Sequence, residues 1–295
     1  MTRALVLSGG GVKGAYQVGV LRKWMCEDKI EYDTFSGVSV GALNASILAQ
    51  VSHGKPHEAY RLMKDIWDVV DNSNIRRDWN FFGKIAALWK GHVYNTKPLQ
   101  DWVKRDVHPE ALKASGKQLL VGATCLDTGM YKVVREDTPD LWKWVYASAA
   151  FPLFFQEALL EGQLWVDGGA RNVTPLGDVI RQGADEIDII MTSNPNKIKH
   201  WNHKGKKIWQ KAFRLLEILM SEITLNDIQT AGLKNDLARL GAGYKEVKIR
   251  LIYPEDQLVD DSLDFNPESI REMQEIGYSD ALKADEFSLD LSKLP

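Results

Sequence analysis

The chain has 295 residues, of which 44% are hydrophobic and 26% charged, which is enough apolar material for one large core. Its two cysteines, Cys26 and Cys125, exclude a disulfide framework. A formal net charge of −3 and a sequence pI near 6.1 argue against a general nucleic-acid binder.

The first predicted element is a strand that leads through a glycine-rich loop into a helix. The apolar run 4–7 is followed by Ser8 and three glycines, and apolar residues return at helical spacing from Ala15. The first turn of a helix has backbone N–H groups without partners, and glycine lets another group approach them. We therefore expect this loop to hold a negatively charged oxygen, as an oxyanion hole does in acyl transfer.

The second predicted strand, 34–38, is followed by a run of helix formers, 42–50, which places Ser39 on the turn between them. Gly37 and Gly41 flank this serine in the pattern G-x-S-x-G. A strand that turns sharply into a helix brings these two positions together, where a Cβ would clash, and exposes the serine hydroxyl. The segment is predicted to be a nucleophile elbow.

Further strands are predicted from short apolar runs that alternate with helical patterns. Together they favour an α/β fold, with a mainly parallel central sheet and helices on both faces. No linker or internal repeat divides the chain, so we expect a single domain over 1–295. The later predicted strands are 118–125, 164–166, 187–191 and 247–253.

Asp167 ends one of these strands and is followed by Gly168 and Gly169. A serine nucleophile needs a group that takes its proton. An aspartate serves if burial raises its pKa and if the tetrahedral intermediate is stabilised elsewhere. Asp167 is therefore the candidate base.

These three motifs, in this order, resemble the patatin-like phospholipase family, whose pattern is G-G-G-x-K/R-G, then G-x-S-x-G, then D-G-G/A. The small-residue block 147–152, Ala-Ser-Ala-Ala-Phe-Pro, is similar to the block that the family carries before its aspartate. The resemblance covers about residues 3–195, leaving a C-terminal extension of about 196–295. The residues that match the family's oxyanion loop are Gly9, Gly10, Gly11, Val12, Lys13 and Gly14.

The resemblance implies a three-layer fold and a lipid acyl hydrolase of the phospholipase A or lysophospholipase type. It matches Ser39 to the nucleophile and Asp167 to its partner in a catalytic dyad, and it implies no metal and no cofactor. Backbone N–H groups around Gly10, Gly11 and Val12 are expected to hold the oxyanion. Phospholipid or lysophospholipid is the expected substrate, and the oligomeric state stays open.

Two alternatives use other residues. A Ser-His-Asp esterase needs a histidine after the acid in the chain, an order that His200 and His203 satisfy, although they lie in a lysine-rich stretch without strand-end context. A dinucleotide-binding protein would use G-x-G-x-x-G at residues 9–14 with Asp33 on the ribose, which leaves Ser39 unexplained. A binding protein on a hydrolase scaffold is a third alternative.

Two aromatic segments have more than one interpretation. The segment 197–214 is rich in lysine and has no acidic residue, so it is either a contact for anionic lipid or part of a helix whose lysines face the solvent. In the second interpretation, the residues that face the core are Ile208, Trp209, Ala212, Phe213, Leu215 and Leu216. The segment 75–93 mixes aromatic and basic residues and is a lid, an acyl-chain pocket or ordinary core.

The expected compartment follows from the apolar segments. The stretch after Arg3 is too short for a signal peptide, and no window approaches the length of a membrane span. We therefore expect a cytoplasmic protein, with peripheral contact to a membrane if the segment 197–214 binds lipid.

Overall fold

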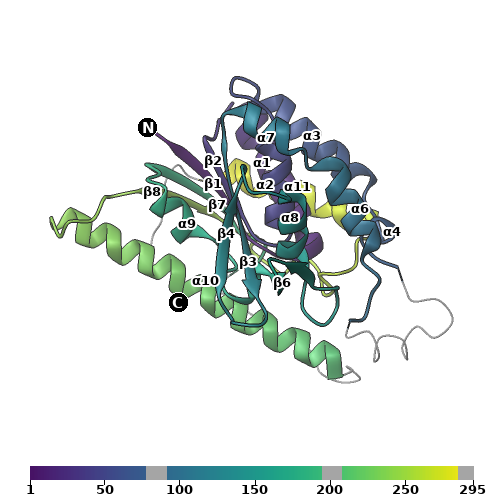
Figure 1. Ribbon diagram of the computed structural model, residues 1–295. Coiled ribbons are helices and arrows are strands. Elements are labelled where there is room, and N and C mark those ends of the chain that lie inside the picture. The colour runs from purple at the N-terminus through teal and green to yellow at the C-terminus, as the bar shows by residue number, and fades with distance from the viewer. Residues whose placement is uncertain (78–91, 195–207, 285–295) are drawn as a thin grey trace.

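A sheet of eight strands forms the centre of the molecule in the computed structural model, which describes residues 1–77, 92–194 and 208–284 (Figure 1). The spatial order is β5-β6-β3-β2-β1-β7-β8, with β4 pairing to β3. The five strands from β3 to β8 in this order are parallel, and β4, β5 and β6 add an antiparallel end. The strands are β1 (Arg3–Leu7), β2 (Thr34–Gly37), β3 (Gln118–Cys125), β4 (Tyr131–Arg135), β5 (Ala158–Leu160), β6 (Gln163–Asp167), β7 (Glu186–Ile190) and β8 (Lys248–Ile252).

Helices cover both faces of the sheet. Alternate side chains of β1 point to opposite faces, so that Leu5 and Leu7 join the larger apolar core while Ala4 and Val6 join the smaller one. The larger core is completed by α1 (Gly14–Leu21), α2 (Val40–Leu48), α3 (Pro56–Val69), α4 (Asn72–Ile75), α6 (Lys97–Asp106), α7 (Pro109–Ser115), α8 (Leu141–Ala149) and α11 (Pro267–Lys283). The smaller core lies under α9 (Leu176–Arg181) and the long α10 (Ile208–Arg239). The predicted three-layer α/β architecture is confirmed.

Each predicted strand is present, with ends that differ from the expected ones by no more than one residue. Two strands are additional. β5 has only three residues, too few to show a periodic pattern, and β4 has partly exposed side chains on both of its faces. These two strands belong to the antiparallel end of the sheet.

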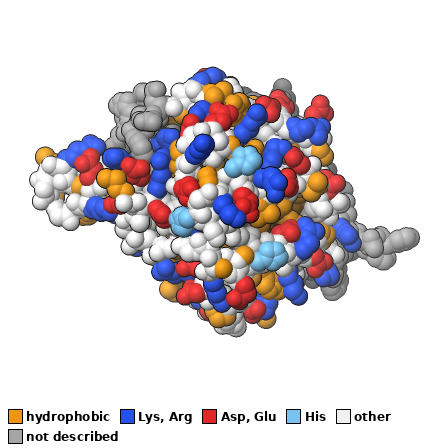
Figure 2. Space-filling model, turned by 90° about the horizontal axis from the view of Figure 1, so that it is seen from above, with side chains coloured by type: hydrophobic (Ala, Val, Ile, Leu, Met, Phe, Trp, Pro, Cys, Tyr) orange, Lys and Arg blue, Asp and Glu red, His pale blue; other side chains and the backbone are white. Residues whose placement is uncertain are grey.

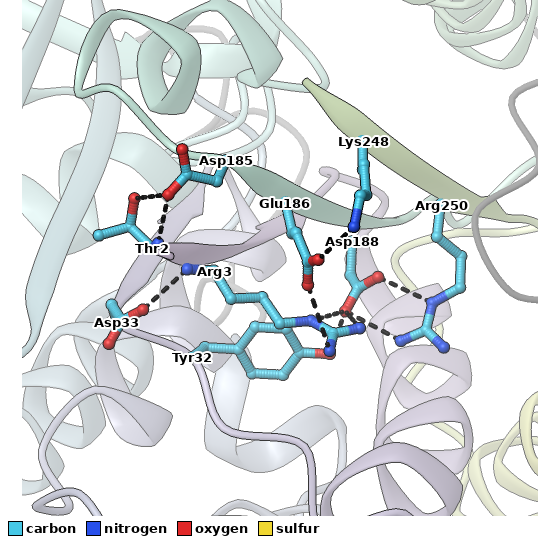
Figure 3. Close-up of polar contacts among 9 residues, drawn as sticks. All are labelled: Thr2, Arg3, Tyr32, Asp33, Asp185, Glu186, Asp188, Lys248 and Arg250. Atoms are coloured by element: carbon cyan, nitrogen blue, oxygen red, sulfur yellow. Dashed lines mark hydrogen bonds and ion pairs between the residues drawn. The ribbon is translucent and has the colours of Figure 1, made fainter. Parts of the chain in front are cut away.

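A buried ion cluster ties three neighbouring strands together (Figure 3). Asp188 on β7 is fully buried and accepts hydrogen bonds from the guanidinium of Arg250 on β8, at 2.7 and 2.9 Å. Arg3 on β1 lies 2.9 Å from the same carboxylate, and the Tyr32 hydroxyl donates to it at 2.9 Å. Because a buried carboxylate is stable only when it is paired, the cluster fixes β1, β7 and β8 side by side.

The surface carries both signs of charge. On the face seen from above in Figure 2, basic and acidic side chains are interspersed, as the small net charge suggests. None of the helices in the described ranges has the length and hydropathy needed to cross a bilayer.

Helices α1 and α11 pack with their backbones in contact. A Cβ placed on Gly19 of α1 would lie 1.9 Å from the Gln274 carbonyl oxygen, and one on Gly277 of α11 would lie 2.2 Å from that of Tyr16. Only glycine permits such a close approach of the two backbones. The contact with α11 fixes the position of α1, the helix that directly follows the glycine-rich loop.

We expect Gly277→Ala to lower the free energy of unfolding by about 1–3 kcal/mol or more, because the added methyl meets backbone that has no space to move. Gly177→Ala in α9 is the matched control, since its methyl would meet only the end of the flexible Arg181 side chain at 3.2 Å. Urea unfolding followed by circular dichroism measures both variants. Equal stability of the two would contradict the backbone contact.

Candidate active site

Ser39 lies on a sharp turn between β2 and α2. Its φ of 55° and ψ of −131° are unusual for a residue that is not glycine, and this conformation carries strain. A Cβ on Gly37 would lie 2.3 Å from the backbone of Gly41, and one on Gly41 would lie 2.1 Å from the Leu7 carbonyl oxygen. The two glycines of the motif are therefore required by backbone contacts on both sides of the serine.

The end of α8 holds both Ser39 and Asp167. The Ser39 N–H donates to the backbone oxygen of Ser148 at 3.0 Å and to its hydroxyl at 3.1 Å. Two residues on, the Ala150 carbonyl accepts the Asp167 N–H at 3.0 Å. No sequence motif identifies this contact of Ser148. The block of small residues at 147–150 was the available signal, because only small side chains allow such close backbone contacts.

Asp167 is a buried carboxyl group beside Ser39. Its Oδ1 accepts the Gly169 N–H at 2.7 Å, while Oδ2 has no hydrogen-bond partner of ordinary geometry within the described residues. Burial raises the pKa of Asp167 to about 7, against the opposing effects of the Ser39 hydroxyl and the Gly169 N–H. Neither of these two groups is a cation, so they offset the effect of burial only in part. The carboxyl group therefore gains or loses its proton near neutral pH.

The glycine-rich loop passes directly over the serine. A Cβ on Gly9 would lie 3.1 Å from Cβ of Ser39, so the loop backbone and Ser39 are in close contact. Gly10 and Gly11 have φ values of 155° and 60°, which favour glycine. Gly11 begins a short 3₁₀ turn, η1 (Gly11–Lys13), which leads into α1.

The backbone N–H groups of this loop differ in availability. Gly9 donates to the Val173 carbonyl at 3.1 Å and Lys13 to that of Gly10 at 3.3 Å. Val12, which we expected to help hold the oxyanion, donates to the Ser262 carbonyl at 2.9 Å instead. Within the described residues, the N–H groups of Gly10 and Gly11 have no such partner and are the available donors.

A cavity of about 160 Å³ opens at Ser39 and the loop. The part contributed by α2, α3, α6 and the segment after α8 is mainly apolar, although it contains Asn44, and its apolar residues include Leu43, Trp67, Leu99, Trp102, Phe151 and Phe155. The loops that follow β1, β7 and β8, together with α10, contribute polar side chains, among them Lys13, Thr192, Ser193, Asn194, Arg214 and Gln257. The site therefore presents both an apolar and a polar lining to a ligand.

A family model described as patatin-like phospholipase matches residues 5–180, which is more than half of the chain. The chain belongs to the patatin-like phospholipase family.

Its relatives are distant. It is 27% identical over 198 residues to the uncharacterized protein YjjU of Escherichia coli, covering 64% of this chain and 51% of that one. It is 23% identical over 233 residues to patatin-like phospholipase domain-containing protein 7 of Rattus norvegicus, covering 77% of this chain and 16% of that one. Among solved structures, VipD from Legionella pneumophila aligns with a TM-score of 0.44 and 17% identity, covering 96% of this chain and 66% of that one. The chain spans about half the length of YjjU.

Asp33 lies at the opposite end of the strands from the glycine-rich loop, where a dinucleotide-binding site would need it. It precedes β2, and its carboxylate accepts the Arg3 N–H at 2.7 Å, beside the beginning of β1. Ser39 and the glycine-rich loop follow the opposite, carboxyl ends of the same two strands. The carboxylate therefore cannot reach a ribose held at that loop.

Several predicted features fall wholly or partly outside the described residues. His200 and His203 of the alternative triad do so, as do residues 78–91 of the aromatic segment and 197–207 of the lysine-rich one. Within the ranges 1–77, 92–194 and 208–284, no group of three or more His, Cys, Asp or Glu side chains is arranged to hold a metal ion.

We expect the stability of the protein to depend on pH through Asp167. Its pKa in the fold, about 7, lies above the ordinary 3.8, so its stabilising contribution is complete below about pH 4 and is lost as the pH rises to about 7. Asp167→Asn does not titrate. The free energy of unfolding of this variant, relative to wild type, should therefore increase between pH 4 and pH 8 by up to about 4 kcal/mol.

Urea unfolding of both proteins at several pH values gives this difference, in which the contributions of all other titrating groups cancel. A constant difference across this range would mean that Asp167 keeps an ordinary pKa.

Proposed function

We propose that the protein is a lipid acyl hydrolase that cleaves carboxylic esters with a Ser39–Asp167 dyad. The observation that carries the proposal is the fully buried Asp167 beside the strained Ser39, with a pKa raised to about 7. A carboxylate with this pKa takes a proton from serine far better than one with an ordinary pKa, and it still ionises at neutral pH. Membership of the patatin-like phospholipase family supports the same chemistry.

In the proposed reaction, Ser39 Oγ attacks the ester carbonyl while its proton passes to Asp167. The N–H groups of Gly10 and Gly11 donate to the negative oxygen of the tetrahedral intermediate. The intermediate collapses, Asp167 returns the proton to the leaving alcohol, and an acyl-Ser39 ester remains. Water, deprotonated by Asp167, then attacks this ester, and the second tetrahedral intermediate collapses as Asp167 returns the proton to Ser39 Oγ, which releases the fatty acid and restores the free serine.

The lining of the cavity supports an amphiphilic substrate of the phospholipase A or lysophospholipase type. An acyl chain fits the apolar part formed by residues such as Leu43, Trp67 and Leu99. A phosphate-containing headgroup fits the part that contains Lys13 and Arg214.

We expect wild-type protein to release fatty acid from lysophospholipid in the presence of a chelator. The variants Ser39→Ala and Asp167→Asn should each reduce kcat/KM at least 1000-fold, because each removes one member of the dyad. In wild type, kcat/KM should rise with pH and level off above about pH 7, since only the charged form of Asp167 accepts the proton.

His53→Ala is the control, because this exposed side chain pairs with Glu31 at the surface and lies outside the cavity lining. Full activity in either dyad variant would exclude the proposed mechanism.

The N-terminal part of α10 supports contact with a lipid surface. Leu215 and Leu219 are 58% and 52% exposed, and Ile218 is 38% exposed while it also lines the cavity. The i, i+3, i+4 spacing places all three on one side of the helix, next to the exposed Lys211. Leu215 is exposed, contrary to the expectation that it faces the core, and the side chains of the other residues expected there, Ile208, Trp209, Ala212, Phe213 and Leu216, lie outside the described part of the chain. We infer that this side of α10 rests on a membrane that contains the substrate.

For the double variant Leu215→Ser/Leu219→Ser we expect at least tenfold weaker binding to anionic vesicles, because two apolar side chains no longer enter the lipid. Hydrolysis of a water-soluble p-nitrophenyl ester should stay within twofold of wild type. Vesicle flotation and ester assays measure the two effects.

The control is Leu233→Ser/Leu237→Ser. These leucines are 61% and 40% exposed and lie 18 residues, or five turns, further along α10, on the same side and about 27 Å away. If both double variants bind vesicles equally well, contact next to the cavity is excluded.

A further inference from the structure

The side chain of Thr192, which also lines the cavity, is hydrogen-bonded to the glycine-rich loop. Thr192 follows β7 and is buried, and its hydroxyl donates to the Gly9 carbonyl oxygen at 2.5 Å. Its own N–H donates to the Ser8 hydroxyl at 3.0 Å, so the threonine is bound to the loop through both its backbone and its side chain. The loop and the segment after β7 are thus joined directly at the carboxyl ends of β1 and β7.

This contact determines the direction of an N–H group. The Gly9 carbonyl and the Gly10 N–H belong to one planar peptide unit, and no peptide bond among the described residues is cis. In a trans peptide the two groups point in opposite directions. With the Gly9 oxygen bound to Thr192, the Gly10 N–H is directed away from Thr192.

The next peptide unit is held in a comparable way. The Gly10 carbonyl accepts the Lys13 N–H at 3.3 Å, which turns the Gly11 N–H to the other side. The fit around Thr192 is also close, since a Cβ on Gly10 would lie 2.1 Å from its hydroxyl oxygen. Thr192 therefore limits both the rotation and the displacement of the Gly9–Gly10 peptide.

We propose that Thr192 is a positioning residue of the ester hydrolase, which fixes the Gly10 N–H in the direction that stabilises the oxyanion. The inference rests on the proposed function and adds a residue to it. Thr192 lies beyond residues 5–180, the segment matched by the family model, and no local sequence motif identifies it. Because an oxyanion donor acts on the transition state more than on the bound substrate, loss of its alignment should lower kcat and leave KM nearly unchanged.

The test compares Thr192→Val, which keeps the shape but loses the hydroxyl, with Thr192→Ser, which keeps the hydroxyl. We expect kcat to fall 10- to 100-fold in the valine variant, with KM within threefold of wild type, and to stay within threefold of wild type in the serine variant. An alkyl trifluoromethyl ketone, whose serine adduct carries the same oxyanion, should bind more weakly to the valine variant by a similar factor.

Thr34→Val is the matched control. Thr34 is also buried, and its hydroxyl bonds to Gln118 at the amino end of β2, away from the cavity. Thermal unfolding establishes which variants are folded. If Thr192→Val does not fold, Thr192→Ala replaces it, because alanine removes the same hydroxyl without adding a methyl group.

Unchanged kcat in the variant that lacks the hydroxyl would overturn the positioning role, and so would equal losses in the valine and serine variants. A rise in KM alone would also overturn it, since it would indicate contact with the substrate. Wild-type protein that neither hydrolyses esters nor binds the ketone would overturn the proposed function itself, and the role of Thr192 with it.

Discussion

The contact between the backbone of Gly41 and the carbonyl of Leu7 is the constraint on which the rest of the site depends. It places the first turn of α2 directly against the end of β1, so the chain must reverse within one residue, Ser39. Such a conformation costs on the order of 1–3 kcal/mol and persists only where the surroundings enforce it. Ser148 binds the serine N–H from one side, and Gly9 lies against its Cβ on the other. The hydroxyl is consequently exposed to the cavity by the backbone alone.

Asp167 has to be buried and yet able to ionise. Burial alone favours the neutral acid, and the neighbours that offset it are a hydroxyl and a single backbone N–H rather than a cation. A lysine or arginine in direct contact would lower the pKa and weaken the base, so the positive groups that line the cavity serve the reaction best at a distance from this carboxylate. In the proposed mechanism the fold thereby separates two tasks, since the aspartate would move the proton and the backbone of the glycine-rich loop would receive the developing charge.

Local patterns in the sequence predicted the parallel strands, the elbow and the position of Asp167 at a strand end, because each depends on residues that are close in the chain. Gly37 and Gly41 identify the turn, and apolar runs between polar residues identify β1 and β7. Interactions between distant segments were not predictable in this way. The use of the Val12 N–H by Ser262 joins residues 250 positions apart, and the contacts of Ser148 and Thr192 leave no periodic pattern. Short strands such as β5 form only because β6 is present beside them.

The position of β1 in the middle of the sheet has a consequence for synthesis of the chain. β1 is made first, but its neighbour β7 follows roughly 180 residues later, and Arg250, which binds Asp188 on β7, later still. At about 5–20 residues per second, the ribosome needs on the order of ten seconds or more to supply them. Until then the glycine-rich loop lacks the support that Thr192 and Ser262 provide. A nascent chain therefore carries Ser39 long before the segments that order its glycine-rich loop, so under the proposed mechanism ester cleavage waits for the synthesis of Thr192 and Ser262.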